Sequence, residues 1–163
     1  ICWSLVGSEM CIRDSYKAVR DEHFHNLRNQ GIALKPGFDA LFYAIKQHGL
    51  LTAIVTSSHL PEVKHNFSGS EYLAQFDLVI TAEDVERGKP NPDCYQMAYR
   101  HLGVDAKQCL VLEDSNNGIK AALAAKCQAV MIPDLLPPLP ELEDKVIIKA
   151  SLEEVIPLVD PFG

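Results

Sequence analysis

Residues 109–127 read CLVLEDSNNGIKAALAAKC, and this stretch decides the fold. The apolar residues 109–112 come first, the polar cluster EDSNNG follows at 113–118, and residues 117–126 have the composition of a helix. A short, continuous apolar run is typical of a parallel strand that is buried on both faces. The stretch therefore predicts a strand, a polar turn and a helix, which together are the repeating unit of an α/β fold.

The same unit recurs on both sides of this stretch. Further apolar runs lie at 51–55, 77–80 and 129–132. Helices are expected at 16–30, from Pro36 to Gly49, at 61–75 with an interruption at 68–70, and at 92–102. Apolar runs that alternate with helices predict a doubly wound parallel sheet with right-handed crossovers. In such a sheet, ligands bind beyond the carboxyl ends of the strands.

Composition restricts the class of protein. The chain has 163 residues, of which 47% are hydrophobic and 23% charged, as is typical of one soluble globular domain. Its formal net charge of −7 argues against nucleic acid or an anionic membrane surface as a partner, because both need basic patches. No apolar run approaches the roughly 18 residues that span a bilayer. The five cysteines form no C-x-x-C pair, which favours reduced thiols in the cytoplasm.

Polar residues follow three of the predicted strands where those strands end. In chain order, Thr56 and Ser57 follow the first run, Lys89 the second, and Glu113 and Asp114 the third. Hydroxyl groups and a lysine suit a phosphate group, whereas carboxylates suit Mg²⁺, which prefers oxygen ligands. Each signal alone has an ordinary alternative, because hydroxyl and acidic residues also cap helices and a lysine can lie in a solvated loop. The combination at one edge of the sheet predicts a phosphate and divalent-metal site.

Two other features receive ordinary structural interpretations. Tyr95 is expected to pack within the helix at 92–102. The acidic, proline-rich stretch 133–144 is predicted to be a surface loop. The alternative is that this stretch borders the site, because it follows the apolar run at 129–132.

Three strings carry a specific resemblance: IVTSS at 54–58, GKPNPDCYQMAYRHLGV at 88–104, and residues 109–127. Residues 36–160, about three-quarters of the chain, resemble the core domain of the haloacid dehalogenase-like hydrolases. Within that superfamily they are most similar to the β-phosphoglucomutase-like phosphatases. The resemblance implies a Rossmann-like core at 36–163, preceded at 16–35 by the last helix of the family's cap and its linker. It also implies a Mg²⁺-dependent phosphatase or phosphomutase that acts on a small phosphorylated metabolite, such as a sugar phosphate.

The resemblance further implies a role for each candidate residue. Thr56 matches the residue that hydrogen-bonds the transferring phosphoryl group, and Ser57 beside it is a substrate-binding candidate. Lys89 matches the lysine that steadies the nucleophile and the phosphoryl charge. Glu113 and Asp114 match the acidic residues that hold Mg²⁺, with Asp114 the stronger candidate.

The nucleophile of the family is an aspartate in a D-x-D-G-T motif, which forms an aspartyl-phosphate. No D-x-D-G-T occurs in the sequence, and Asp14 lacks both a preceding strand and the second aspartate. We therefore expect an N-terminally truncated fragment whose residues 1–15 are foreign to the fold, with no meaningful phosphatase activity and weak metal binding. In the family, the nucleophile strand lies in the middle of the sheet. An empty place would leave two strand edges unpaired. Either residues 1–6 fill it, which we expect, or the sheet splits or collapses around it.

Three other interpretations remain open from the sequence. A non-catalytic phosphate-binding module that has lost its nucleophile is one of them, and an in-frame D-x-D-G-T upstream would exclude it. A response-regulator-like signalling domain also has acidic strand ends, but GKPNP and the spacing of LEDSNNG have no place in it. A dehalogenase that attacks carbon uses a related core. The sequence defines neither the substrate, because the family's cap carries most of the specificity, nor the oligomeric state.

Overall fold

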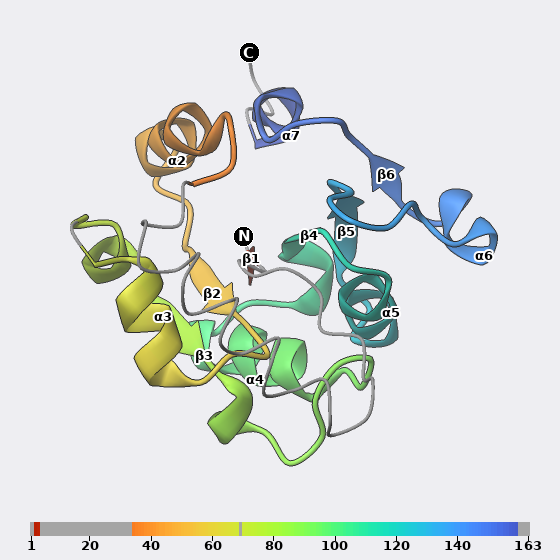
Figure 1. Ribbon diagram of the computed structural model, residues 1–163, viewed down its shortest axis with the longest axis horizontal. Coiled ribbons are helices and arrows are strands. Elements are labelled where there is room, and N and C mark those ends of the chain that lie inside the picture. The colour runs from red at the N-terminus through yellow and green to blue at the C-terminus, as the bar shows by residue number, and fades with distance from the viewer. Residues whose placement is uncertain (1, 4–33, 69, 160–163) are drawn as a thin grey trace, which may run out of the picture.

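A parallel sheet forms the centre of the molecule (Figure 1). The computed structural model describes residues 2–3, 34–68 and 70–159. In this part of the chain, parallel strands pair in the order β3-β2-β1-β4-β5-β6. The strands are β1 Cys2–Trp3, β2 Ala53–Val55, β3 Leu78–Ile80, β4 Leu110–Glu113, β5 Gln128–Met131 and β6 Ile147–Ile148. The predicted doubly wound sheet is confirmed, with β6 as a strand that the apolar runs did not predict.

Helices connect the strands and cover both faces of the sheet (Figure 1). The α-helices are α2 Phe38–Gln47, α3 Leu60–Asn66, α4 Asp93–Leu102, α5 Asn116–Ala124, α6 Pro140–Glu143 and α7 Ile156–Val159. Short 3₁₀ turns are η1 Leu73–Gln75, η2 Ala82–Asp84, η3 Ala106–Gln108 and η4 Glu153–Val155. The predicted helix at 61–75 is divided into α3 and η1, and the stretch 133–144 contains α6 instead of being loop throughout. The helix expected at 16–30 lies outside the described residues.

The strands bury both faces, which explains their continuous apolar runs. Ala53, Val55 and Val111 pack on one side of the sheet with residues of α4 and α5. Ile54 and Leu112, their immediate neighbours in sequence, pack on the other side with residues of α2 and α3. Successive side chains of a strand point to opposite faces, so a strand between two helical layers needs apolar residues at every position.

The central place in the sheet is taken by β1. Cys2 pairs with Ala53 of β2 and with Val111 of β4. The expectation that residues 1–6 fill this place is confirmed for the two residues that the structure describes there. The strand pairs with two residues of each neighbour, Ala53 and Ile54 of β2 and Val111 and Leu112 of β4, and so covers part of both interior edges of the sheet.

A polar network at the amino end of β2 joins three elements. Thr52 donates hydrogen bonds to the Asp77 carboxylate from its backbone N at 2.7 Å and from its Oγ1 at 2.9 Å. Lys46 at the end of α2 donates to Thr52 Oγ1 at 2.9 Å. Burial acts to raise the pKa of Asp77, but the hydrogen bonds from Thr52 and the charge of Lys46 outweigh it and hold the pKa below its ordinary value. The network ties α2 to the start of the sheet, at the end opposite to the strand ends that carry the candidate residues.

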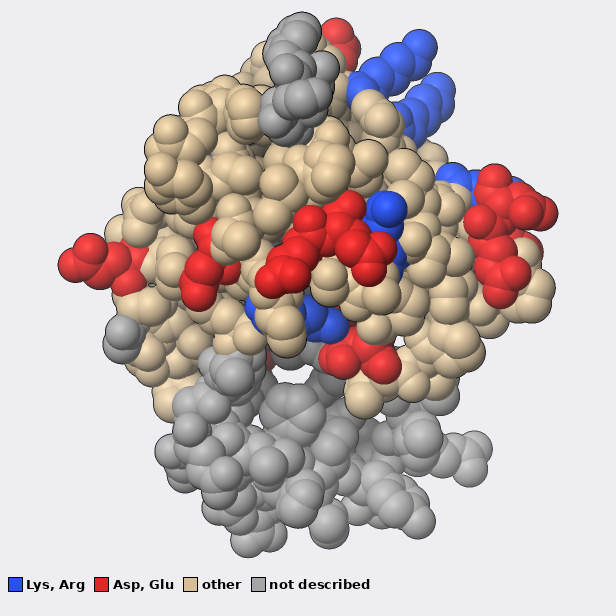
Figure 2. Space-filling model, turned by 90° about the horizontal axis from the view of Figure 1, so that it is seen from above, with Lys and Arg blue, Asp and Glu red and all other residues tan. Residues whose placement is uncertain are grey.

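Acidic side chains gather on the face of the molecule that Figure 2 shows. Figure 2 shows acidic side chains across the centre of one face, with basic side chains beside them instead of a continuous basic surface among the described residues of this view. This arrangement agrees with the net charge of −7 and offers no electrostatic footprint for nucleic acid on this face. In the described part of the chain, every helix is too short or too polar to cross a bilayer.

Candidate active site

The candidate residues lie at the carboxyl ends of the strands. Thr56 follows β2 directly, and Glu113 is the last residue of β4, with Asp114 after it. Lys89 comes from the loop between η2 and α4. Thr56, Glu113 and Asp114 are buried, whereas Ser57 is exposed. Because β2 and β4 flank β1 on either side, their ends face one another across the central strand.

Lys89 bridges these two strand ends. Its Nζ donates a hydrogen bond to the backbone oxygen of Val55 at 3.0 Å and forms an ion pair with Glu113 Oε1 at 2.6 Å. The ammonium also lies 5.1 Å from the centre of the Tyr95 ring, within the range of a cation–π contact. Only 7% of the Lys89 side chain is exposed, so this positive charge is held in one place at the edge of the sheet. The structure therefore brings together the loop lysine and the two strand ends that the sequence singled out.

Glu113 is the partner that holds the lysine. Its Oε1 accepts hydrogen bonds from Lys89 and from the Tyr95 hydroxyl, and its Oε2 accepts one from Ser115 Oγ at 3.1 Å. The residue is 1% exposed. A buried carboxylate is tolerated when a cation and hydrogen-bond donors satisfy it, as they do here. Because both carboxylate oxygens already have donors, the geometry favours Glu113 as a partner of Lys89, and its role as a metal ligand stays a prediction.

Gly118 makes room for this carboxylate. A Cβ atom at Gly118 would lie 1.9–2.2 Å from the carboxyl atoms of Glu113, which is far closer than any real contact. The backbone N of Gly118 donates to Ser115 Oγ at 3.1 Å, so the first turn of α5 wraps around the Glu113 side chain. The glycine of the string EDSNNG is therefore required by close packing, which is one of the few reasons for a glycine inside a helix.

Asp114 differs from Glu113 because part of its carboxylate has no partner. The residue is 7% exposed, and its Oδ1 is buried without a hydrogen bond among the described residues. Its Oδ2 lies 3.9 Å from Lys35 Nζ, at the outer limit of an ion pair. Burial, together with the charge of Glu113, raises the pKa of Asp114 to about 6. An unsatisfied, buried carboxylate oxygen is a suitable ligand for a hard divalent cation.

The donor set for such a cation is small in the described part of the chain. No group of three or more His, Cys, Asp or Glu side chains lies together there. Mg²⁺ often takes only one or two carboxylates and keeps several waters, so Asp114 fits as one ligand. The remaining ligands would be water, phosphate oxygens, or groups outside the described residues.

Thr56 begins a tight turn at the end of β2. Its Oγ1 accepts a hydrogen bond from the backbone N of Ser58 at 3.0 Å, and its own backbone N donates to Ile80 at 2.9 Å. The carbonyl of Ser58 accepts a bond from Ala82 at 3.1 Å, which ties the turn to the loop after β3. These bonds hold Thr56 in place at the strand end, where the residue is 4% exposed. Ser57, in the same turn, is the more accessible hydroxyl.

Sequence reasoning missed two residues of this site and covered a third only through the alternative that the stretch 133–144 borders it. Tyr95 was expected only to pack, yet it is buried and its hydroxyl contacts Glu113. Lys35, which precedes α2, lies 3.5 Å from Asp134 Oδ2 as well as near Asp114. Asp134 follows β5 at the same edge, and its place after the run 129–132 was a usable signal. Neither Tyr95 nor Lys35 carries such a signal, because their contacts depend on how α4 and the segment before α2 pack.

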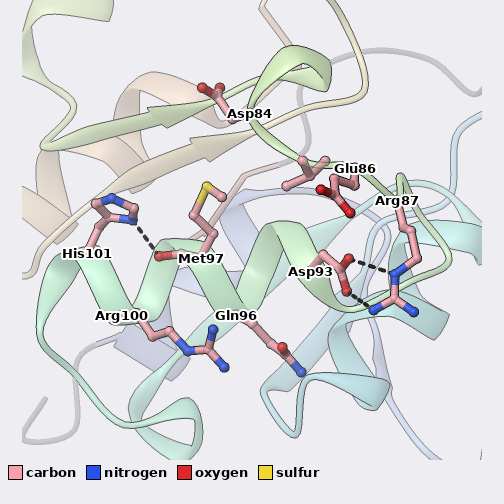
Figure 3. Close-up of a pocket in the computed structure, with 9 residues that line it drawn as sticks. Asp84, Glu86, Arg87, Asp93, Gln96, Met97, Arg100 and His101 are labelled. Carbon is pink, nitrogen blue, oxygen red and sulfur yellow. Dashed lines mark hydrogen bonds and ion pairs between the residues drawn. The ribbon is translucent and has the colours of Figure 1, made fainter.

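A separate surface groove of about 570 Å³ lies along α4 (Figure 3). Within it, Arg87 makes two 2.9 Å hydrogen bonds to the Asp93 carboxylate. None of the candidate residues lines this groove. The groove along α4 is therefore separate from the candidate residues at the strand ends.

Comparisons with known proteins are consistent with this geometry. A family model for haloacid dehalogenase-like hydrolases matches residues 4–132. Hexitol phosphatase A of Escherichia coli is 33% identical over 147 residues, which cover 89% of this chain and 66% of that protein. The protein CbbY of Cereibacter sphaeroides is 34% identical over 126 residues, which cover 75% of this chain and 54% of that protein. The chain thus spans about two thirds of the length of the first of these relatives and about half of the second.

Solved structures show the same fold. A crystal structure of a CbbY variant from Rhodobacter sphaeroides with xylulose-(1,5)-bisphosphate has a TM-score of 0.74 at 29% identity, and covers 86% of this chain and 64% of that one. A putative β-phosphoglucomutase from Thermotoga maritima has a TM-score of 0.77 at 22% identity, covering 93% of this chain and 73% of that one. The second likeness concerns the fold alone.

Proposed function

The chain belongs to the haloacid dehalogenase-like hydrolase family, and we propose that it carries part of the active site of a Mg²⁺-dependent phosphoryl-transfer hydrolase. The substrate class is a small phosphorylated metabolite, such as a sugar phosphate, and the reaction is that of a phosphatase or a phosphomutase. The family assignment removes the support for the response-regulator-like alternative. Hexitol phosphatase A and CbbY with its bound bisphosphate support a phosphorylated substrate in place of a haloacid.

One observation carries the proposal. The buried Lys89–Glu113 pair fixes a positive charge at the edge of the sheet, and Asp114, the residue after Glu113, has a buried Oδ1 that lacks a hydrogen bond among the described residues. A fixed ammonium stabilises the charge on a transferring phosphoryl group, because it needs no reorganisation during the reaction. The hydroxyl of Thr56 is suited to donate to a phosphoryl oxygen, and Ser57 to contact the substrate.

The metal ion has a defined place in this proposal. Asp114 would hold Mg²⁺, and Glu113 would contribute mainly by orienting Lys89. When bound, the ion supplies neutralising charge and orients the phosphate group. The residues of the chain themselves position the phosphoryl group and exclude water from the lysine.

The covalent step needs an aspartate that this chain does not offer in a recognisable motif. The resemblance places that aspartate after the central strand, where this chain has β1, and no D-x-D-G-T occurs in the sequence. Phosphoryl transfer depends on an in-line nucleophile in addition to charge stabilisation. We therefore propose that the 163 residues by themselves bind phosphate but do not hydrolyse phosphate esters.

A second candidate function is a phosphate-binding module without catalysis. The absence of the nucleophile motif favours it, and it uses the same Thr56, Lys89 and Asp114. The two functions differ in their response to a nucleophile strand supplied from a relative. A catalytic site regains turnover with a D-x-D-G-T segment, whereas a binding module does not.

The test therefore compares two proteins. The 163-residue chain and a fusion of it to the N-terminal segment of hexitol phosphatase A are assayed with p-nitrophenyl phosphate and Mg²⁺. We expect turnover in the fusion only, with its loss in Asp114→Ala and Lys89→Met and its retention in the surface control Lys120→Met. Magnesium-dependent turnover by the unfused chain that Asp114→Ala abolishes would refute the proposed lack of a nucleophile. A folded but inactive fusion that still binds inorganic phosphate would favour the binding module.

A further inference from the structure

Lys35 and Asp134 flank the carboxylate of Asp114 and have no part in the chemistry described so far. Lys35 Nζ lies 3.9 Å from Asp114 Oδ2 and 3.5 Å from Asp134 Oδ2. The Lys35 side chain is 30% exposed and that of Asp134 49%, whereas that of Asp114 is 5% exposed. The ammonium thus sits at the solvent side of a buried carboxylate, between it and a second, exposed carboxylate.

The contact with Asp114 is incomplete. Lys35 approaches Oδ2 only, and Oδ1 remains buried without a partner among the described residues. Glu113 offers no compensation, because it is itself an anion whose oxygens are engaged by Lys89, Tyr95 and Ser115. Asp114 therefore keeps an unmet demand for positive charge that a single, distant ammonium does not satisfy.

We propose that Lys35 is a built-in counter-ion of the cation site, which competes with a divalent cation for Asp114 and moves to Asp134 when the cation binds. This inference rests on the proposed role of Asp114 as a metal ligand. Two cations at one carboxylate repel each other, so binding of the metal ion favours displacement of the ammonium. The flexible four-carbon stem of lysine and its partial exposure permit the movement, and Asp134 is already within reach.

The proposal gives each residue a different effect on metal affinity. Without the Lys35 charge, a divalent cation binds Asp114 with no competitor, so the dissociation constant decreases. Without the Asp134 charge, the displaced ammonium has no acceptor and the dissociation constant increases. If Asp134 acts through Lys35, the effect of changing Asp134 is reduced once Lys35 is neutral.

The experiment measures Mn²⁺ binding to the 163-residue chain from the electron paramagnetic resonance signal of free Mn²⁺, with Mg²⁺ as competitor. We expect Lys35→Met and Lys35→Gln to decrease the dissociation constant by about tenfold, and Lys35→Arg, which keeps the charge, to leave it unchanged. Asp134→Asn increases it, and does so less in the Lys35→Met background. Lys120→Met is the matched control, because Lys120 pairs with Glu141 at 3.3 Å on the surface. Circular dichroism confirms that each variant is folded.

The outcomes separate this inference from the proposed function. If Lys35→Met and Lys35→Gln leave affinity unchanged or weaken it while Asp114→Asn abolishes binding, the inference is wrong and the metal role of Asp114 stands. If Asp114→Asn does not alter binding, the metal role itself is refuted, and the inference with it. Binding that is detectable only in the neutral Lys35 variants supports the inference, and its absence from all of them overturns it.

Discussion

The substitution Gly118→Ala sets local helix propensity against tertiary packing. Alanine is about 1 kcal/mol better than glycine inside a helix, so propensity alone predicts that the change stabilises α5. The structure predicts the opposite, because the new Cβ would lie 1.9–2.2 Å from the carboxyl atoms of Glu113. Contacts of this length cannot persist, so either the Glu113 side chain or the first turn of α5 has to move.

The magnitude depends on the contacts that Glu113 makes. Displacing it breaks the 2.6 Å ion pair with Lys89 and the hydrogen bond from Tyr95, and leaves charged groups buried. Breaking a buried ion pair in this way typically costs about 3–5 kcal/mol. After the gain of about 1 kcal/mol from helix propensity, we expect Gly118→Ala to lower the free energy of unfolding by about 3 kcal/mol.

The assay is urea unfolding followed by circular dichroism at pH 7. The matched control is Gly88→Ala, which adds the same methyl group beside Lys89 where no atom lies within 4 Å of it. We expect the control to change stability by less than about 1 kcal/mol. In a Glu113→Ala background, which removes the clashing carboxylate, Gly118→Ala should no longer destabilise. A Gly118→Ala chain that is as stable as the parent, or more so, would refute the packing argument.

Three other substitutions test the contacts of individual side chains: two at the candidate site and one in the Thr52–Asp77–Lys46 network. Asp114→Asn should raise the free energy of unfolding by about 3 kcal/mol near pH 7.5. The pKa of Asp114 is about 6 in the folded chain, against an ordinary value of 3.8. The folded state therefore favours the protonated carboxyl group, and the parent chain loses stability as pH rises through 6. Thermal unfolding from pH 3.5 to 8 checks this, and a gain that persists below pH 4, where both side chains are neutral, would contradict it. Tyr95→Phe removes the hydroxyl that contacts Glu113 and should lower stability by about 1–3 kcal/mol in urea unfolding. The control Tyr99→Phe, on the same helix, should leave stability nearly unchanged. Equal effects of the two changes would argue against a contribution of the Tyr95–Glu113 hydrogen bond. Asp77→Asn should lower stability by about 1 kcal/mol at pH 7, a modest value because the side chain is 37% exposed. Since the pKa of Asp77 is lowered in the folded chain, the difference in stability from the parent should shrink as pH falls below the ordinary value of 3.8. A difference that stays constant with pH would contradict the role of the Asp77 charge.

The sheet was predictable because its strands are buried on both faces. A strand such as β4 needs apolar side chains at every position, and this leaves a continuous apolar run in the sequence. The positions of Thr56 and Asp114 followed from the rule that parallel strands end at one edge of the sheet. The place of β1 was predictable for a different reason, because the family resemblance implies a central strand between β2 and β4, and an unfilled centre would leave both without a shared neighbour.

The contacts within the site were not predictable, because they depend on how separate elements approach one another. The hydroxyl of Tyr95 reaches Glu113 at the end of β4 only because of the way α4 packs on β2, β3 and α5. Lys35 reaches Asp114 from a segment that lies 79 positions earlier in the chain, at a strand end with which it shares no local pattern. A pattern along the chain reports which faces are buried, but it does not report the direction of a long side chain across the gap between elements.

The sequence by itself determined the α/β class, the family and the residue types at the strand ends, because burial and turn chemistry are written locally in apolar runs and polar clusters. Tertiary structure alone decided how those residues divide their tasks. It paired Glu113 with Lys89 and added hydrogen bonds to Glu113 from Tyr95 and Ser115. Gly118 leaves space for the Glu113 carboxylate because it has no side chain. It left the adjacent carboxylate of Asp114 buried, with one oxygen that accepts no hydrogen bond from the part of the chain that the structure describes. The two neighbouring acidic residues differ because successive side chains at the end of a strand point in opposite directions and so meet different partners. Which partners lie in each direction depends on how the elements pack, and this cannot be read from the sequence.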